Sequence, residues 1–387
     1  MRSLRPELER LQREHLYRTR RVSAGVQGPE LRLDGRHLLT FCSNDYLGLA
    51  GHPAVAAALK QGVNEYGVGS GAAHLVSGHS RAHHALEEEL AAFTERPRAL
   101  LFSTGYMANL GVITALTGRG DHIYEDKLNH ASLVDGGLLS RADLHRFRHV
   151  EVASLQRQMD GHPLGEALVA TDGVFSMDGD IAPLPDLAVS CRKQGAWLLV
   201  DDAHGLGVLG HQGRGSCHHF GLGVEDVPVL MGTLGKALGT FGAFVAGSED
   251  LIETLIQTAR SYIYTTATPP AVAEATRASL ACVLDEQWRR DHLFALIDRF
   301  RSGAEELGLP LMASDTPIQP IVAGTSAQAI RWGRQLEAEG ILVTPIRPPT
   351  VPEGSARLRV TLSAKHTPDQ VDRLLDALAR LNGAESP

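Results

Sequence analysis

The sequence predicts an α/β protein with an open sheet and a second, smaller domain, and three observations lead to that prediction. From about residue 99 to residue 247, short apolar runs alternate with amphipathic helical segments. Most of those apolar runs end in polar or glycine-rich residues, as strands of a ligand-binding α/β sheet do. Beyond about residue 290 the alternation changes, which predicts a small α+β domain over residues 290–387.

Composition limits the classes of protein to consider. The chain has 387 residues, 43% of them hydrophobic and 21% charged, which is typical of a globular protein with a large core. Its net charge of −8 is spread along the chain without a basic block, so nucleic-acid and anionic-membrane partners are disfavoured. The four cysteines form no CxxC pair, no apolar run reaches membrane-spanning length, and the charged N-terminus lacks a signal-peptide core. We therefore expect a cytoplasmic protein with reduced thiols.

Residues 1–50 are predicted to precede the large domain. Leu4, Leu8 and Leu11 recur at helical spacing, which predicts an amphipathic helix within residues 1–21 that packs on the body. The segment from Glu30 to Leu39, turning at Asp34-Gly35, predicts a short hairpin.

The large domain is predicted to span residues 51–289, beginning with a helix near Pro53. The glycine-dense stretch 67–79 contains no G-x-G-x-x-G, so it favours a flexible loop lining a pocket over a dinucleotide fingerprint.

Five predicted strands end in groups that can bind a ligand. The strands cover residues 99–102, 122–124, 168–171, 197–200 and 227–231. In the same order, the groups that follow them are Ser103 and Gly105, the Asp126–His130 loop, Asp172 and Ser176, Asp201 and His204, and Thr233 and Lys236. Ligands of open α/β sheets bind at the carboxyl ends of the strands, so we expect these groups to converge on one crevice.

A lysine and an Asp-x-x-His sequence, each closing a buried strand, indicate pyridoxal phosphate (PLP). Lys236 can condense with a carbonyl as a Schiff base, and Asp201 can keep a pyridinium nitrogen protonated. Thr104-Gly105 at a helix start suits a phosphate, although a plain helix cap explains that stretch equally well by itself. Tyr106 is equally open to a role in core packing.

At this point the sequence resembles the α-oxoamine synthases, a branch of the fold-type-I PLP-dependent enzymes. The motifs that carry the resemblance span essentially the whole chain: Asn44-Asp45-Tyr46-Leu47-Gly48, Ser103-Thr104-Gly105-Tyr106, Asn129-His130-Ala131-Ser132, Phe175-Ser176-Met177-Asp178-Gly179, Asp201-Asp202-Ala203-His204-Gly205 and Thr233-x-x-Lys236. The resemblance implies an aspartate aminotransferase-like fold with a seven-stranded, mostly parallel sheet. It also implies a homodimer with active sites at the subunit interface.

The resemblance assigns catalytic and cofactor roles to the matching residues. Lys236 would hold PLP covalently and then act as the base that removes the α-proton of the amino acid. Asp201 would pair with the pyridinium nitrogen, and His204 would hydrogen-bond the phenolic oxygen with Ser176 close by. His130 would stack on the ring and assist condensation and decarboxylation. The phosphate would be held by Gly105, Tyr106 and Thr233, with Thr265 and Thr266 reaching the site of the other subunit.

Substrate roles follow from the same resemblance. Arg359, helped by Asn44, would grip the amino-acid carboxylate, while Arg18 and Thr350 match acyl-substrate positions. The stretch Pro345–Pro352, followed by Ala356–Arg359, is most similar to the members of biotin biosynthesis that condense L-alanine with pimeloyl-CoA or pimeloyl-[acyl carrier protein]. That activity would make the chain a PLP-dependent acyltransferase.

Several alternatives stay open or are disfavoured. A sister synthase using glycine or serine with another acyl-CoA is the nearest rival, such as 5-aminolevulinate synthase, 2-amino-3-ketobutyrate CoA ligase or serine palmitoyltransferase. An apolar pocket discriminates a methyl group by only about 1–3 kcal/mol. A nucleotide-binding protein is disfavoured because the glycine motifs are missing, and an inactive scaffold because Lys236 and Asp201 are both present. Asp172 stands where the family usually has glutamate, which predicts a looser contact near His130 or a substrate.

Overall fold

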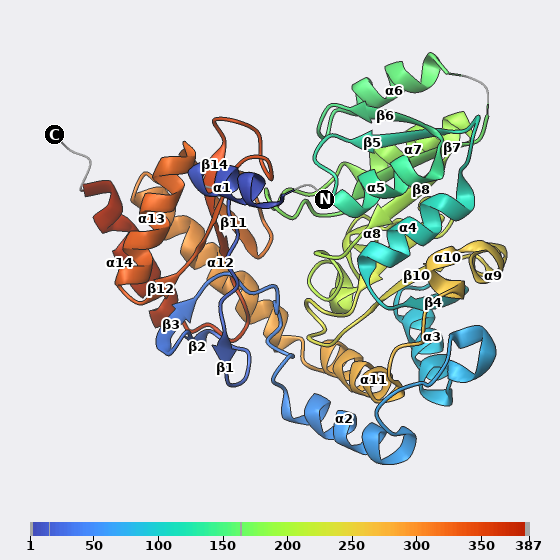
Figure 1. Cartoon of the computed structure of the whole chain (residues 1–387), viewed down its shortest axis with the longest axis horizontal. Helices are drawn as coiled ribbons and strands as arrows, with labels where there is room; N and C mark the ends of the chain where they lie inside the picture. The colour runs from blue at the N-terminus through green and yellow to red at the C-terminus, as the bar shows by residue number, and fades with distance from the viewer. Residues whose placement is uncertain (1–2, 15, 163–164, 384–387) are drawn as a thin grey trace.

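A computed structural model describes residues 3–14, 16–162 and 165–383 of the chain. Figure 1 shows a large α/β body and, beside it, a smaller body that contains the last helices of the chain together with the N-terminal strands. Within the described ranges, none of the helices combines the length and the apolar character that crossing a membrane requires.

A seven-stranded sheet forms the centre of the large body. Its strands are β4 (Arg98–Phe102), β5 (His122–Asp126), β6 (Asp143–Phe147), β7 (Ala167–Asp172), β8 (Trp197–Asp201), β9 (Val229–Thr233) and β10 (Ala243–Gly247). The strands lie in the order β4-β10-β9-β8-β7-β5-β6, and all pairings are parallel except the two made by β10. The predicted seven-stranded, mostly parallel sheet of the fold-type-I class is therefore confirmed.

Helices cover both faces of this sheet, which explains why its strands read as continuous apolar runs. The helices of the large body are α2 (Pro53–Tyr66), α3 (Arg81–Phe93), α4 (Gly105–Leu116), α5 (Ala131–Ser140), α6 (Val152–Asp160), α7 (Leu184–Gln194), α8 (Ser216–His219), α9 (Glu249–Thr258), α10 (Arg260–Ile263) and α11 (Pro270–Asp285). Leu199 packs in the core under α4, α5 and α9, whereas its neighbours Leu198 and Val200 pack in the core under α6 and α7. The inner strand β8 thus buries side chains on both sides of the sheet.

The smaller body combines two sheets with three helices. A three-stranded antiparallel sheet has the order β11 (Ile318–Gly324), β14 (Ala356–Thr361), β13 (Thr344–Ile346). The helices are α12 (Trp288–Glu306), α13 (Ser326–Ala338) and α14 (Pro368–Gly383). The predicted hairpin is present as β2 (Glu30–Leu33) and β3 (Arg36–Thr40), and it lies in one sheet with β1 (Ser23–Ala24) and β12 (Ile341–Leu342). Because β3 pairs with β12, the N-terminal hairpin joins the C-terminal region, while the domain boundaries at residues 50 and 289 stay a prediction.

Two features differ from the expectations. The N-terminal helix α1 is shorter than predicted, covering only Arg5–Arg13, and it lies against residues 345–350 of the smaller body without burying any of its residues in the core. Its Leu8 and Leu11 instead line a pocket, which explains their helical spacing without core burial. Strand β6 was not predicted. It lies at the edge of the sheet and buries only the side chain of Phe147, so its sequence contains no apolar run.

A partly buried ionic triad near the carboxyl edge of the sheet gives the fold a specific pH dependence. Nδ1 of His149 lies 2.8 Å from Asp126 Oδ1, and its Nε2 lies 3.0 Å from Asp180 Oδ2. Burial opposes the charge on His149, but the two carboxylates outweigh it and raise the pKa of His149 to about 10. The stabilisation is therefore complete below the pKa of the unfolded state, about 6.5, and is lost as the pH rises through the folded value.

We expect His149→Gln to lower the free energy of unfolding by about 1–3 kcal/mol near pH 6, because a charge-assisted contact to each carboxylate is lost. The difference in unfolding free energy between His149→Gln and the unsubstituted protein should shrink towards pH 10, because His149 loses its proton there. Urea unfolding at both pH values measures it, with the exposed His37→Gln as the control. An equal difference at both pH values would contradict a protonated His149.

Candidate active site

The carboxyl ends of five parallel strands surround a pocket of about 190 Å³. Its lining comes from the last residues of β7, β8 and β9 and from the segments that follow β4, β5, β8 and β9: Gly105, Tyr106, His130, Ser132, Asp172, Asp201, Ala203, His204, Met231, Thr233 and Lys236. The structure thus brings together residues from all five predicted strand ends. The distances and charges within this pocket decide what chemistry it can perform.

Lys236 provides an amine whose proton affinity is reduced. Burial lowers the pKa of Lys236, and the carboxylates of Asp201 and Asp172 oppose that shift only in part. A lysine with a lowered pKa has a larger neutral fraction near neutral pH. The neutral amine is the form that attacks a carbonyl and the form that accepts a proton, so Lys236 is suited to both tasks.

Asp201 is a buried carboxylate that its neighbours hold in a fixed orientation. Its Oδ2 accepts a hydrogen bond of 2.7 Å from Nδ2 of Asn109, and its Oδ1 accepts one of 3.0 Å from the Ala203 amide. Asn109 also donates to the Ser132 hydroxyl at 2.8 Å. Sequence reasoning missed Asn109, although a lone amide on the apolar helix α4 was the available signal. These contacts orient Asp201 before any ligand binds.

His204 is a neutral imidazole positioned by Tyr46. Burial, followed by the charges of Lys236 and Arg359, holds the pKa of His204 well below its ordinary value. The Tyr46 hydroxyl lies 2.6 Å from His204 Nδ1 and 3.3 Å from Asn44 Oδ1, so the shorter contact defines the stronger hydrogen bond. Burial raises the pKa of Tyr46 to about 12, so its hydroxyl stays protonated and can donate to Nδ1. The ring proton of His204 then sits on Nε2, which is available to a ligand oxygen.

His130 caps helix α5 and is held in place by Asp172 and Ser132. Its amide donates to Asp172 Oδ2 at 2.7 Å, and its Nδ1 accepts from the Ser132 amide at 3.3 Å. Burial lowers the pKa of His130, although the residue keeps an exposed face. The shorter side chain of Asp172 was predicted to loosen a contact near His130 or a substrate. At the His130 amide the hydrogen bond to Asp172 is short, so this contact is not loosened. Burial and the neighbouring Asp201 raise the pKa of Asp172 well above its ordinary value.

The start of helix α4 has backbone N–H groups that can bind an anion. The Thr104 side chain accepts from the Met107 amide at 3.2 Å, and the amides of Gly105 and Tyr106 lie in the first turn without intrahelical partners. Backbone N–H groups at such a helix start attract phosphate. The Tyr106 side chain is 41% exposed and its hydroxyl bonds to Asp135, so it is not a core residue.

Gly105 has no space for a side chain on the side of Thr233. A Cβ at position 105 would lie 2.8 Å from Thr233 Cγ2. We expect Gly105→Ala to displace Thr233 and to weaken binding of a phosphorylated cofactor about tenfold, because Gly105 and Thr233 line the same pocket beside the free first-turn amides of α4. Fluorescence titration with PLP measures the loss, and Gly28→Ala, where a Cβ meets nothing within 4 Å, is the control. Equal PLP affinities of Gly105→Ala and Gly28→Ala would contradict a role for Gly105 in phosphate binding.

Arg359 reaches the site from strand β14 of the smaller body. It is 6% exposed, and it donates from Nε to the Ser176 carbonyl at 2.6 Å and from a terminal nitrogen to Asn44 Oδ1 at 3.2 Å. Among the described residues no carboxylate pairs with Arg359, whereas the neighbouring Arg357 pairs with Asp178. A buried guanidinium with only neutral acceptors favours an anionic ligand.

The remaining predicted residues lie outside the strand-end pocket. Arg18 and Thr350 line one pocket of about 680 Å³ together with Leu8, Leu11 and the segment 345–349. Thr266 is exposed and forms an isolated antiparallel bridge with Ala73, so this chain does not bring it to Lys236.

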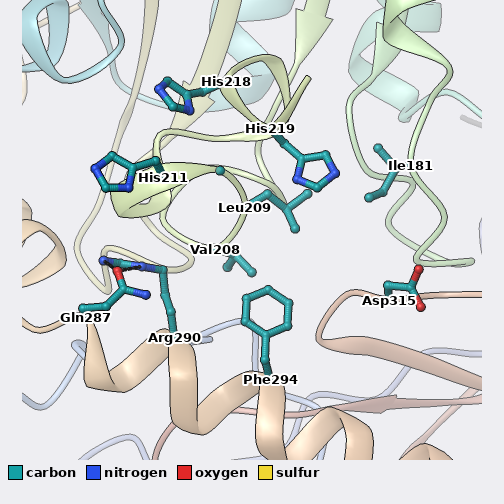
Figure 2. A pocket seen from close by; sticks show the side chains of 11 residues that line it. Ile181, Val208, Leu209, His211, His218, His219, Gln287, Arg290, Phe294 and Asp315 are labelled. Atoms are coloured by element: carbon teal, nitrogen blue, oxygen red, sulfur yellow. Dashed lines mark hydrogen bonds between the residues drawn. The ribbon is translucent and has the colours of Figure 1, made fainter. Parts of the chain in front are cut away.

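A further pocket of about 500 Å³ contains none of the predicted site residues (Figure 2). It lies between helix α12, which carries Arg290 and Phe294, and the segment that carries His211, His218 and His219. The guanidinium of Arg290 is already occupied, since it donates to the Val283 carbonyl at 2.6 Å and to Gln287 Oε1 at 3.0 Å. This larger pocket therefore offers neither the lysine nor the strand-end carboxylate on which the proposed chemistry depends.

The chain belongs to the family of class I and II aminotransferases, whose family model matches residues 36–378. It is 64% identical over 387 residues to the 8-amino-7-oxononanoate synthase of Thioalkalivibrio sulfidiphilus, covering 100% of this chain and 99% of that protein. The enzyme of the same name from Nitrosococcus oceani is 64% identical over 375 residues, with 97% and 100% covered.

Solved structures agree with this assignment. A Sphingomonas wittichii serine palmitoyltransferase is 34% identical with a TM-score of 0.92, covering 98% of this chain and 96% of that chain. The 8-amino-7-oxononanoate synthase of Francisella tularensis is 34% identical with a TM-score of 0.80, covering 90% and 98%. The predicted resemblance to fold-type-I PLP enzymes is thereby confirmed.

Proposed function

We propose that this chain is a PLP-dependent acyltransferase that condenses L-alanine with a pimeloyl thioester. The products would be 8-amino-7-oxononanoate, CO₂ and the free thiol carrier, as a step of biotin biosynthesis. One observation carries the proposal: Lys236, with its lowered pKa, shares one strand-end pocket with Asp201 and His204. Relatives of nearly full length that are named for this activity support it.

The donor set of the pocket fits pyridoxal phosphate. Asp201 offers an oriented carboxylate for a protonated ring nitrogen, and Lys236 offers an amine of lowered pKa for an aldehyde. The first-turn amides of α4, beside Thr233, offer donors to a phosphate. When bound, PLP supplies an electron-poor ring that accepts the electron pair left when an amino acid loses its α-proton.

We assign the amino-acid chemistry to three side chains. Arg359 binds the carboxylate of alanine through its guanidinium fork, with Asn44 holding that fork from the side. Lys236, as the neutral amine, takes the α-proton. His130 has its proton on Nε2, because Nδ1 accepts from Ser132, and it can therefore donate to the thioester carbonyl oxygen.

The acyl chain would occupy the pocket that Arg18 and Thr350 line. A pimeloyl group is a run of methylenes that ends in a carboxylate, and this pocket combines Leu8, Leu11 and Ile346 with arginine side chains. Strand β13 contributes Ile346 and pairs with β14 so that Thr344 lies opposite Arg359. The acyl pocket therefore begins one strand away from the proposed carboxylate site. Both pimeloyl-CoA and a pimeloyl carrier protein are compatible with this arrangement.

A homodimer and a cytoplasmic location complete the proposal. Large apolar side chains are exposed at Val68 (82%), Val76 (78%), Tyr264 (71%) and Leu138 (65%), and a second copy of the chain would cover them. Thr265 and Thr266, which lie next to Tyr264, would then reach the phosphate site of the other subunit.

The four cysteines are free thiols, which favours a reducing compartment such as the cytoplasm.

Release of free thiol under two substrate pairs tests the proposed function. The holoenzyme is assayed with L-alanine plus pimeloyl-CoA and, separately, with glycine plus succinyl-CoA. We expect kcat/KM to be at least about tenfold higher for the alanine pair, because both the amino-acid methyl group and the acyl length discriminate. Faster turnover with the glycine pair would replace the proposal by the sister activity.

A further inference from the structure

The loop between β7 and α7 is where the large body meets the strand that carries Arg359. It covers residues 173–183. The loop closes on itself, because the Gly179 amide donates to the Phe175 carbonyl at 2.8 Å and the Phe175 amide donates to the Asp180 carbonyl at 3.0 Å. Gly179 has a φ of +76°, a backbone conformation that favours glycine. The loop therefore has a defined conformation of its own.

The smaller body packs directly against this loop at Gly179. The Thr316 hydroxyl donates to the Gly179 carbonyl at 3.0 Å. A Cβ at position 179 would lie 2.4 Å from the Ile318 carbonyl oxygen and 2.5 Å from the Ser314 hydroxyl oxygen. The loop and the segment that leads into β11 are thus packed together without space for a side chain between them.

Two arginines of strand β14 contact the same loop. Arg357 and Arg359 are two positions apart in β14, so their side chains lie on one face of the strand. Arg357 is 3% exposed and donates to a carboxylate oxygen of Asp178, which is 7% exposed. Arg359 donates from Nε to the Ser176 carbonyl at 2.6 Å. The buried ion pair and the contact that orients Arg359 therefore join the same two segments of the chain, side by side.

The orientation of Arg359 determines what its remaining N–H groups can bind. Its Nε is used by the Ser176 carbonyl, and its terminal nitrogens contact Thr361 Oγ1 at 3.0 Å and Asn44 Oδ1 at 3.2 Å. Each terminal nitrogen carries a second N–H. A shift of the Ser176 carbonyl would turn the guanidinium plane and change the direction of these N–H groups. Bidentate binding of a carboxylate depends on that direction.

We propose that Asp178 and Arg357 are positioning residues for the carboxylate of the amino-acid substrate. The pair fixes the loop against β14, the loop fixes the Ser176 carbonyl, and that carbonyl aims Arg359. The inference rests on the proposed function, in which Arg359 binds the carboxylate of L-alanine. A buried ion pair is a weak way to stabilise a fold, because desolvation offsets most of the attraction, and this favours a geometric role for the pair.

Visible-spectrum titration of the PLP-loaded protein with L-alanine tests the positioning role. Asp178→Asn keeps the shape of the side chain and removes its charge, so we expect the Kd of L-alanine to rise about tenfold. The Kd of ethylamine, which is alanine without its carboxylate, should stay within about twofold, whereas a general structural defect would weaken binding of both amines. In steady-state assays KM for L-alanine should rise about tenfold while kcat changes less, because the contact is present in the ground state as well.

The double variant Asp178→Asn/Arg357→Gln leaves neither charge unpaired in the interior, so it keeps the test informative where the single variant loses stability. We expect the same rise in the Kd of L-alanine as for Asp178→Asn alone, since both variants remove one and the same contact. The matched control is Asp372→Asn, because Asp372 pairs with Arg299 at an exposed position between α12 and α14. An unchanged Kd of L-alanine in the double variant, or an equal rise in Kd for both amines, would overturn the proposal.

Arg359→Lys separates this inference from the proposed function. We expect this variant to weaken L-alanine binding more than Asp178→Asn does, since a lysine cannot form the bidentate contact, and to leave the Kd of ethylamine unchanged. An unchanged Kd of L-alanine in Arg359→Lys would overturn both the proposed carboxylate site and the positioning role. Weakened binding in Arg359→Lys, with unchanged binding in both Asp178 variants, would overturn the positioning role alone.

Discussion

Replacing Lys236 by alanine is expected to lower kcat/KM with L-alanine and pimeloyl-CoA by about 10⁴-fold or more, because one side chain provides both the covalent attachment and the base. The pocket contains no second lysine among its lining residues, so no neighbouring amine can replace it. Steady-state thiol release measures the effect. Lys193→Ala, on the exposed end of α7, should leave the rate unchanged.

Retention of more than about a tenth of the activity in Lys236→Ala would contradict the role of Lys236, since a rate loss of that size is worth only about 1.4 kcal/mol. An unchanged circular dichroism spectrum confirms that the variant is folded, so that a lost rate reports chemistry.

Asp201→Asn is expected to lower kcat by about 10³-fold while the fold is retained. Asparagine has nearly the same shape as aspartate, but it carries no charge and cannot hold a ring nitrogen in its protonated form. In addition, its amide nitrogen would compete with that of Asn109, which now donates to Asp201 at 2.7 Å. Comparison of kcat for both proteins at saturating substrate measures the loss.

The matched control for Asp201→Asn is its neighbour Asp202→Asn. Asp202 is fully buried, but it accepts from the amide and the hydroxyl of Ser216 at 2.8 and 2.7 Å, away from the pocket lining. We expect this second variant to change stability and to keep kcat within a few-fold. A similar loss of kcat in both variants would indicate a general effect of charge or packing at this strand end.

The sequence predicted the parts of the site that follow apolar runs. Lys236 and Asp201 could be identified because buried parallel strands read as continuous hydrophobic segments, and their carboxyl ends meet at one edge. Asn109 and Tyr46 gave no such signal. Asn109 lies within an apolar helix, and the role of Tyr46 depends on a contact with His204 across 158 positions of the chain.

Other features needed information that local pattern cannot supply. Strand β6 escaped prediction because an edge strand needs little apolar surface. The leucine spacing of α1 predicted a helix on the body, but it could not show that these leucines line a pocket and stay outside the core. Arg18 and Thr350 were suggested by family resemblance alone, since an arginine on a polar segment has no distinguishing pattern. The structure places both on one pocket, although they are 332 positions apart by their residue numbers.

Location of the covalently held cofactor is the most direct test of the account that the strand-end pocket is a pyridoxal phosphate site. The purified protein is incubated with PLP, reduced with borohydride and digested, and the peptides are mapped by mass spectrometry. The chain contains five lysines, namely Lys60, Lys127, Lys193, Lys236 and Lys365. The predicted result is one phosphopyridoxyl group per chain, on Lys236. Stoichiometric modification of another lysine, with Lys236 unmodified, would contradict the account.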